Sequence, residues 1–288
     1  MRRVQSLIKW LLVLALVVSL TSLAIASDNC DGIYGTGTHQ FSLATGSPGE
    51  LGLLKVLAEE FGKEYWTTLC WKKAGSGASL KLLKEKKVDA IMVHAPAAEK
   101  RAIQEGWAVK RTLIGSNEFY IVGPVDDPAG IATAKSAPEA YKRIAKAKAK
   151  FLSRGDNSGT HKKEMAIWQM AGISPAVSWY IVTKDFMMAT LKKANEVRGY
   201  FMTDSSTWVA GKKELPNLKI LFRGDPFLVN TYHGLCQPPG ATPGQEYAAK
   251  FIDFLGSEKG QNIIATYGKD LYGEGIYNDA AYAEQFEH

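Results

Sequence analysis

The chain has 288 residues, which is too long for a small disulfide-stapled module and enough for two lobes with separate cores. Its residues are 46% hydrophobic and 22% charged, proportions typical of an ordinary globular protein. The formal net charge is a modest +6 at pH 7, and neither the three cysteines nor any acidic or histidine cluster has a spacing typical of a metal or cofactor site.

The first 26 residues predict a cleavable secretory signal. Arg2, Arg3 and Lys9 precede the apolar run WLLVLALVVSL, and Ala24 and Ala26 offer small residues for cleavage after Ala26. An uncleaved anchor is the alternative, because the apolar stretch of 17 residues is at the short limit of a spanning helix. Cleavage leaves 32 cationic residues (35 − 3) against 29 anionic ones, and a charge of +3 argues against a nucleic-acid-binding protein. We therefore expect a periplasmic location.

The cysteines leave two alternatives. An oxidising compartment permits one disulfide among Cys30, Cys70 and Cys236, and Cys70–Cys236 is the pairing that we expect first. Three reduced or buried cysteines are the other possibility.

Short apolar runs alternate with helical periodicity from the start of the mature chain. We predict strands over residues 39–45, 67–71, 88–94 and 117–124, and helices over 50–65, 79–87 and 97–106. After the turn signal DDPAG we predict, in order, helix 137–150, a strand ending at 153, helix 160–172, strand 179–182, helix 188–197, and strands 199–204, 218–222 and 227–237. Three prolines and two further helical stretches follow. Such alternation predicts a mainly parallel sheet with helices on its faces.

The predicted fold class is α/β with two lobes. We expect a signal peptide over 1–26, a first lobe over 27–121 that is completed by 235–288, and a second lobe over 122–234. Ligands of open α/β sheets bind at the carboxyl ends of strands, so two facing lobes form a cleft that can close around a small molecule.

The segment TGSPGE carries the first candidate residues. Thr45, Gly46 and Ser47 directly follow a predicted strand, where a glycine lets the backbone approach a ligand and a helix N-terminus attracts anions. The structural alternative is a capping box formed by Ser47 and Glu50, with Pro48 at the first helical position.

That capping motif alone is not specific, because Ser136 and Glu139 have the same spacing where we expect no site. A second Gly-rich junction, KKAGSGAS, could present the N–H groups of Ser76 and Gly77 to a ligand. It lacks the Gly-Lys-Ser/Thr ending of a phosphate loop, so nucleotide binding is not indicated, and a turn with a helix cap is the alternative.

The segment FLSRGDNSGTHKKE, residues 151–164, gives the more specific signal. Arg154 stands at the carboxyl end of a predicted strand, beside a helix that Ser158 or Thr160 could cap. A guanidinium supplies a fixed fork of donors that suits an oxyanion, and the helix N-terminus adds a favourable dipole. The alternative is an Arg154–Asp156 ion pair that only shapes the loop.

Two other functions for this segment are weaker. A hydrolase would need Ser158, His161 and Asp156 to line up, and they are too close together in sequence to do so easily. The chain also lacks a Gly-x-Ser-x-Gly elbow, and the RGD tripeptide leads straight into a helix rather than forming an exposed loop tip. We therefore expect no enzyme activity.

Four segments together resemble a known family. VHAPAAEKRAIQEGW, YIVGPVDDPAGI, FLSRGDNSGTHKKE and NEVRGYFMTD are similar, in this order, to segments of the extracytoplasmic tungstate-binding proteins of ABC importers, over about residues 41–267. The resemblance implies a type II-like periplasmic-binding fold that holds an oxyanion, tungstate or molybdate, between its lobes. Carried over by position, Arg154, Ser158, Gly159, Thr160 and Thr203 belong to the ligand set. An ABC permease of the inner membrane is the implied partner.

The chain departs from the family pattern in the first lobe. Where the family has a Thr-Thr-Thr-Ser run, this chain has Ala44, Thr45, Gly46 and Ser47, so two hydroxyls are missing, and Ser205 stands where the family often has arginine. A hydrogen bond to a charged group contributes about 1.5–3 kcal/mol. Either the backbone at Gly46 replaces a hydroxyl and tungstate still binds, or the site accepts a different or larger anion such as a small carboxylate.

Together these features predict a monomeric solute-binding protein that passes a small anion to a permease. A sensor or scavenger that lacks transport is the alternative. Since tungstate, molybdate and sulfate carry no proton near pH 7, their site should offer donors, and we expect Asp156 to be tied to Arg154 or to the backbone instead of facing the anion.

Overall fold

The computed structural model describes residues 30–175 and 178–287. The predicted signal segment, residues 1–26, lies outside this range, and the chain from Asp31 onward is one compact unit. Within the described ranges no helix is long and apolar enough to cross a membrane.

One mixed sheet runs through this unit. Its first half has the strand order β1-β3-β2-β4-β10-β5, with β1 Gly32–Tyr34, β3 Thr67–Lys73, β2 His39–Thr45, β4 Ala90–Val93, β10 Val229–Cys236 and β5 Val109–Pro124. Its second half continues from β5 through β8, β6 and β7, with β8 Tyr200–Asp204, β6 Phe151–Ser153, β7 Tyr180–Val182, and β9 Leu218–Phe222 paired to β5.

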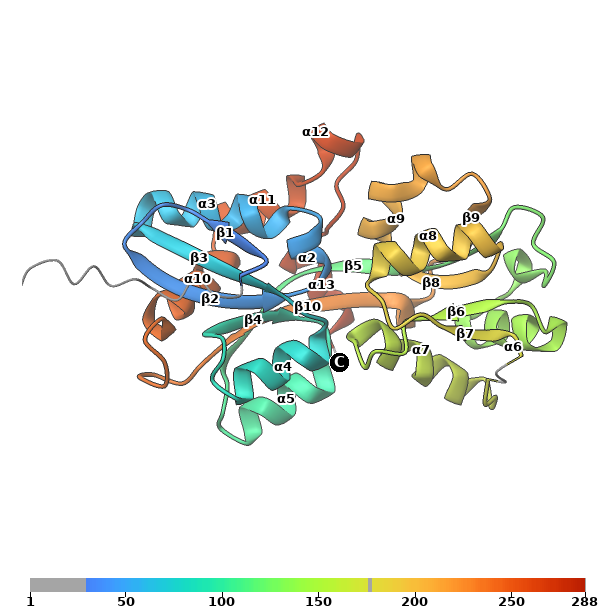
Figure 1. Ribbon diagram of the computed structural model, residues 1–288, viewed down its shortest axis with the longest axis horizontal. Coiled ribbons are helices and arrows are strands. Elements are labelled where there is room, and N and C mark those ends of the chain that lie inside the picture. Colours follow the sequence, from blue (N-terminus) through green and yellow to red (C-terminus); the bar gives the residue numbers. More distant parts are fainter. Residues whose placement is uncertain (1–29, 176–177, 288) are drawn as a thin grey trace, which may run out of the picture. The chain divides into compact units, whose positions relative to one another are not determined.

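The long strand β5 belongs to both halves. Glu118 pairs with Val229 of β10, whereas the next residue, Phe119, pairs with Asp204 of β8. Figure 1 shows β5 and β10 running side by side between the two groups of strands. This arrangement is the two-lobed α/β fold expected from the sequence. The predicted lobe limits at Val122 and Leu235 stay predictions.

The prediction of a mainly parallel sheet was wrong. β2 is parallel to β3 and β4, and β6 is parallel to β7 and β8, as strand–helix alternation requires. β5 and β10, however, are antiparallel to each other and to their other neighbours. The reason is that these two strands carry the chain out to the second half and back, in opposite directions.

Helices cover the first half of the sheet on two faces (Figure 1). α3 Leu53–Tyr65, α10 Gln245–Gly256 and α11 Glu258–Thr266 pack together on one face, and α4 Ser76–Lys84 and α5 Pro96–Gln104 pack together on the other. The short elements of this half are α2 Ser47–Glu50, α12 Lys269–Tyr272, α13 Ala280–Ala283 and η4 Glu284–Phe286.

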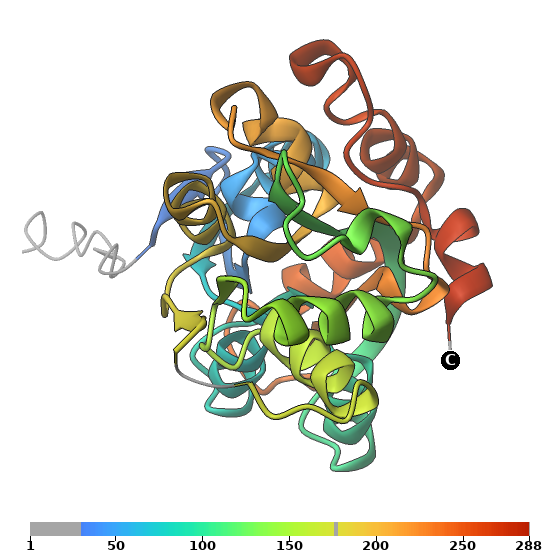
Figure 2. The ribbon, with the colours of Figure 1, turned by 90° about the vertical axis from the view of Figure 1, so that its right-hand side faces the viewer.

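The second half has the same layered plan. α8 Met187–Val197 and α9 Ser205–Gly211 contact each other and β8, while α6 Ala137–Ala147 packs on α7 Gly159–Met170. Figure 2, which looks onto this half, shows α6 and α7 side by side. Its short elements are η1 Ile131–Thr133, η2 Lys212–Glu214 and η3 Pro226–Leu228.

A cluster of aromatic side chains fixes α7 against β6. The ring of Trp168, fully buried, lies 4.3 Å from that of Tyr141 and 5.1 Å from that of Phe151, measured between centroids. Each such aromatic pair contributes about 0.5–1.5 kcal/mol beyond simple burial. The rigid packing matters because the loop between β6 and α7 carries Arg154.

Two element predictions needed correction. The helix predicted over 50–65 is broken into α2 and α3, because Gly52 adopts φ of 87°, a left-handed conformation that ends a helix. The strand predicted over 117–124 begins eight residues earlier, at Val109 (117 − 109 = 8), where polar residues in the strand hide its pattern.

The expected Cys70–Cys236 disulfide is wrong. Cys236 is a buried free thiol, whereas Cys30 and Cys70 are disulfide-bonded. Cys70 lies on β3 and Cys236 on β10, and β2 and β4 lie between them. Three strand spacings of about 4.8 Å make about 14 Å, far beyond the reach of a disulfide.

Candidate functional site

The beginnings of α4 and α7, which belong to different halves of the sheet, meet at one place. A Cβ at Gly75, the residue before α4, would lie 3.0 Å from Cβ of Ser158 and 3.7 Å from Nη2 of Arg154. A Cβ at Gly77 would lie only 2.5 Å from the carbonyl oxygen of Asn157. These glycines therefore allow a close approach of the two halves.

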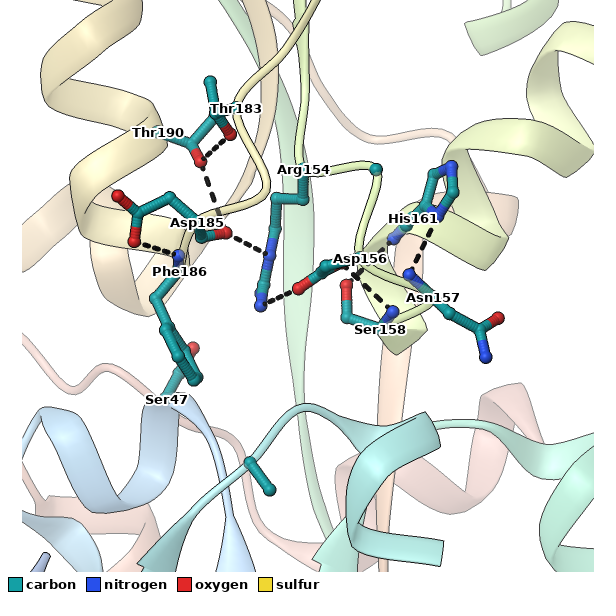
Figure 3. Close-up of polar contacts among 12 residues, drawn as sticks. Ser47, Arg154, Asp156, Asn157, Ser158, His161, Thr183, Asp185, Phe186 and Thr190 are labelled. Atoms are coloured by element: carbon teal, nitrogen blue, oxygen red, sulfur yellow. Dashed lines mark hydrogen bonds and ion pairs between the residues drawn. The ribbon is translucent and has the colours of Figure 1, made fainter. Parts of the chain in front are cut away.

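Arg154 is buried at this meeting point, with 5% of its surface exposed. Its Nε donates to the carbonyl oxygen of Asp185 at 3.2 Å and its Nη2 to Oδ2 of Asp156 at 2.6 Å. Nη1 has no acceptor within residues 30–175 and 178–287. Figure 3 shows the guanidinium held between Asp185 and Asp156 and directed toward the first half. Its remaining N–H groups can therefore donate to a ligand.

Asp156 is tied to its neighbours, as expected from the sequence. Besides its ion pair with Arg154, its Oδ1 accepts from the Ser158 N–H at 3.1 Å. Burial acts to raise the pKa of this carboxyl, but the Arg154 charge and the Ser158 hydrogen bonds outweigh it and hold the pKa below its ordinary value. Asp156 is thus an ionised partner of Arg154.

The first turn of α7 presents unpaired donors. Ser158 caps this helix, because its Oγ accepts from the His161 N–H at 3.3 Å. The N–H groups of Gly159 and Thr160 have no acceptor in the part of the chain that the structure describes, as is normal at a helix start. Among residues 30–175 and 178–287, Oγ1 of Thr160 also has no partner, although only 1% of the residue is exposed. A buried unpaired hydroxyl costs about 1–3 kcal/mol, a cost that an anion acceptor would remove.

The first turn of α4 adds donors from the first half. Ser76 is 3% exposed, and its Oγ accepts from the His94 N–H at 3.2 Å, which leaves its own hydroxyl hydrogen free to donate. The N–H groups of Ser76 and Gly77 belong to the same first turn. The structure therefore brings these two residues together with Arg154 and the start of α7.

Ser47 reaches the second half but does not cap its helix. The cap position of α2 is Gly46, with no side-chain hydrogen bond, and Oγ of Ser47 lies 3.5 Å from Oδ2 of Asp204. The capping box predicted for Ser47 and Glu50 is therefore wrong. Gly46 lies beside Ala74, whose carbonyl oxygen would be 3.4 Å from an added Cβ.

Two other predicted residues are engaged elsewhere. Thr45 is fully buried and its Oγ1 donates to the Met92 carbonyl at 2.9 Å. Oγ1 of Thr203, also fully buried, donates to the Asp204 carbonyl at 3.2 Å. Both hydroxyl hydrogens are therefore used inside the protein, and each oxygen keeps only acceptor capacity.

The surroundings of Ala44 show which of the two missing hydroxyls concerns the site. Its side chain is fully buried in an apolar cluster with Leu83, Ile91 and Val93, under α4. A hydroxyl at this position would lie among those side chains. Of the two hydroxyls absent from the first lobe, the one at Ala44 is therefore not lost from the site.

Comparison with known proteins shows which family the chain resembles. The chain matches the family described as PBP superfamily domain over residues 33–259. It is 34% identical over 243 residues to the tungstate-binding protein TupA of Peptoclostridium acidaminophilum, covering 82% of this chain and 84% of that protein. It is 36% identical over 222 residues to TupA of Campylobacter jejuni, covering 75% of this chain and 82% of that protein.

The chain belongs to the tungstate-binding protein family. The solved structure of the tungstate ABC transporter from Geobacter sulfurreducens is 38% identical to it, with a TM-score of 0.72, and the match covers 80% of this chain and all of that one (100%). The family resemblance noted on four sequence segments is thus confirmed.

His161 and Ser158, the residues of the hydrolase alternative, do not form a nucleophile–base pair. Nδ1 of His161 accepts from the Asn157 N–H at 3.0 Å, and the Ser158 hydroxyl caps α7. Burial, together with the Arg154 charge, lowers the pKa of His161. The imidazole therefore holds the loop before α7 in place.

The sequence did not single out three further residues at the place where the two halves meet: His94, Asn157 and Phe186. A Cβ at Gly159 would lie 2.4 Å from Cε1 of His94, so this histidine packs directly against the start of α7. Burial, with the nearby Arg154 charge, lowers the pKa of His94 to about 3, and the imidazole is neutral. His94 lies in the quoted VHAP segment, but nothing local marks Phe186.

Proposed function

We propose that this protein is the extracytoplasmic solute-binding component of an ABC importer and that it binds a tetrahedral oxyanion, tungstate first and molybdate next. The observation that carries the proposal is the buried start of α7, which Asp156 links to Arg154 through the Ser158 N–H, and where the Thr160 hydroxyl and the first N–H groups have no partner among the described residues. Donors of this kind suit an anion without protons, and the relatives named above are tungstate-binding proteins.

In this proposal the protein acts by closure of its two halves and not by catalysis. Ser76 and Gly77 contribute from the first half, and Arg154, Ser158, Gly159 and Thr160 from the second. Ser47 and Gly46 complete the first-half side, while Thr45 and Thr203 position the backbone. The protein would work in the periplasm as a monomer and deliver the anion to its permease.

A second candidate ligand is a larger anion such as a small carboxylate. It is favoured by the engagement of the Thr45 hydroxyl with Met92, which leaves the first half fewer side-chain donors for a compact tetrahedral ion. The close approach of Gly75 to Ser158 argues against it, since it leaves little room between the halves.

A thermal-shift series with tungstate, molybdate, sulfate, phosphate and small carboxylates separates these ligands. A ligand at 100 times its Kd stabilises the folded state by about 2.7 kcal/mol. We expect the largest rise in Tm with tungstate, followed by molybdate. A rise with a carboxylate and none with either metal oxyanion would overturn the proposed ligand.

Arg154→Ala should remove most of the affinity. Loss of one or two charge-assisted hydrogen bonds, about 1.5–3 kcal/mol each, weakens binding roughly 10- to 150-fold or more. The substitution also leaves the Asp156 carboxylate unpaired and able to repel an anion, so the double variant Arg154→Ala/Asp156→Asn is the control. Calorimetry that finds wild-type tungstate affinity in both variants contradicts the site.

A further inference from the structure

Phe186 is a residue of the second half that the anion-binding residues above leave unexplained. It precedes α8 at the cap position, where its N–H donates to Oδ1 of Asp185 at 2.7 Å. The carbonyl of the same Asp185 accepts from Nε of Arg154 at 3.2 Å. The backbone that carries Phe186 is therefore fastened to the arginine.

The phenyl ring contacts a cation from each half of the sheet. Cζ of Arg154 lies 5.5 Å from the ring centroid, and Nζ of Lys73, at the end of β3 in the first half, lies 4.1 Å from it. Both distances are within the range of cation–π attraction. Figure 3 shows the ring extending from Phe186 toward Ser47 of the first half.

Lys73 is itself fixed by the first half. Its Nζ forms an ion pair of 2.6 Å with Oε1 of Glu50, and its N–H donates to Oδ2 of Asp31. The contact between Phe186 and Lys73 therefore joins two anchored groups across the halves. It is lost when the halves separate.

The same ring limits the space beside the arginine. Asp156 occupies the Nη2 end of the guanidinium, the Asp185 carbonyl occupies Nε, and the phenyl ring lies against the guanidinium on the side of Lys73. An anion that binds the remaining N–H groups is thus separated from solvent on this side by an apolar ring.

We propose that Phe186 is a specificity-determining residue of the anion site, whose ring closes the site on the Lys73 side, sets the largest anion admitted and slows its release. The inference rests on the proposed function. It adds a closing residue that donates no hydrogen bond to the anion.

The test compares Phe186→Ala, Phe186→Leu and Phe186→Tyr, with tungstate and succinate as probes. We expect Phe186→Ala to raise the tungstate dissociation rate about tenfold, as the ring contacts with both cations are lost. Its preference for tungstate over succinate should fall. Phe186→Tyr keeps the aromatic face and should release tungstate at the wild-type rate. Phe186→Leu should have a rate between those of the wild type and Phe186→Ala.

Phe227→Ala is the matched control. Nζ of Lys163 lies 4.5 Å from the Phe227 ring, so this substitution removes a similar cation–π contact that involves neither Arg154 nor Lys73. Phe227→Ala should leave the dissociation rates of tungstate and of succinate unchanged. Stopped-flow dissociation within twofold of wild type in Phe186→Ala, with an unchanged tungstate-to-succinate ratio, overturns the inference and leaves the proposed function standing. Failure of the wild type to bind any oxyanion overturns both.

Discussion

Glu164 is a buried carboxyl one helical turn beyond Thr160, on the same face of α7. Only 1% of the residue is exposed, and its Oε1 accepts from the Tyr180 hydroxyl at 2.5 Å and from Nε1 of Trp168 at 3.2 Å. Across the described ranges no cation forms an ion pair with it. Burial raises its pKa to about 7.

This shift predicts a stability change between pH 4.5 and pH 7. The folded state holds the Glu164 proton more tightly than the unfolded state. The stabilising contribution of this protonation is therefore fully present below pH 4.5, the ordinary pKa of a glutamic acid. It is lost as pH rises through about 7, and its size is on the order of 3 kcal/mol. Glu164→Gln should be less sensitive to pH over this window in urea unfolding. An identical fall in stability in both proteins would contradict the assignment.

His94 acts with the opposite sign and serves as the internal comparison. Burial lowers its pKa to about 3 from 6.5, so its contribution is present above pH 6.5 and is lost as pH falls toward 3. Glu164→Gln leaves this acid-side loss in place. The effects of Glu164 and His94 can therefore be told apart, because stability falls with rising pH for Glu164 and with falling pH for His94.

At the level of elements, two serine caps allow an effect on anion binding to be distinguished from an effect on helix stability. Ser158 caps α7 through the His161 N–H, and Ser136 caps α6 through the Glu139 N–H at 3.3 Å. Ser158→Ala and Ser136→Ala should each lower the free energy of unfolding by about 1 kcal/mol. Only Ser158→Ala should also weaken anion binding, because α7 carries the donors. Equal anion affinity of the two variants, measured by calorimetry, would show that the Ser158 cap does not contribute to the anion site.

The sequence could predict these elements where the contacts that form them join residues close together in the chain. Ser136 caps its helix as the Ser-x-x-Glu spacing indicates, and Ser158 or Thr160 was expected to cap α7, which Ser158 does. The same spacing misled at Ser47, because that side chain turns to Asp204, 157 residues away. No local pattern encodes such a contact.

The same limit applies to the candidate site. Arg154 with its Asp156 partner was visible in one short segment, since the two residues are neighbours in the chain. The contacts of His94 with Gly159 and of Lys73 with Phe186 depend on how the halves meet. The disulfide expectation failed for a related reason, because strand order, and not spacing along the chain, places Cys70 far from Cys236.

For the whole molecule, Gly77 offers a test of closure. Its added Cβ would lie 2.5 Å from the backbone oxygen of Asn157 in the other half, so one of the two backbones must shift away from the other. Gly77→Ala should therefore weaken tungstate binding at least tenfold, about 1.4 kcal/mol, with little loss of stability. A Cβ at Gly256 would meet Thr112 at an ordinary 3.4 Å, so Gly256→Ala is the control and should bind as the wild type does. Unchanged calorimetric affinity in Gly77→Ala would show that the halves need not approach this closely.

The shared strand β5 has a consequence for how such proteins can diversify. Its pairing passes from β10 to β8 between Glu118 and Phe119, with no linker between the two halves. A recombination event that replaced the second half as a block would cut inside a continuous strand and disturb its register with both partners. Ligand preference in this architecture is therefore expected to change by substitutions at the strand ends, such as those at Gly46 and Ser47, and not by exchange of whole lobes.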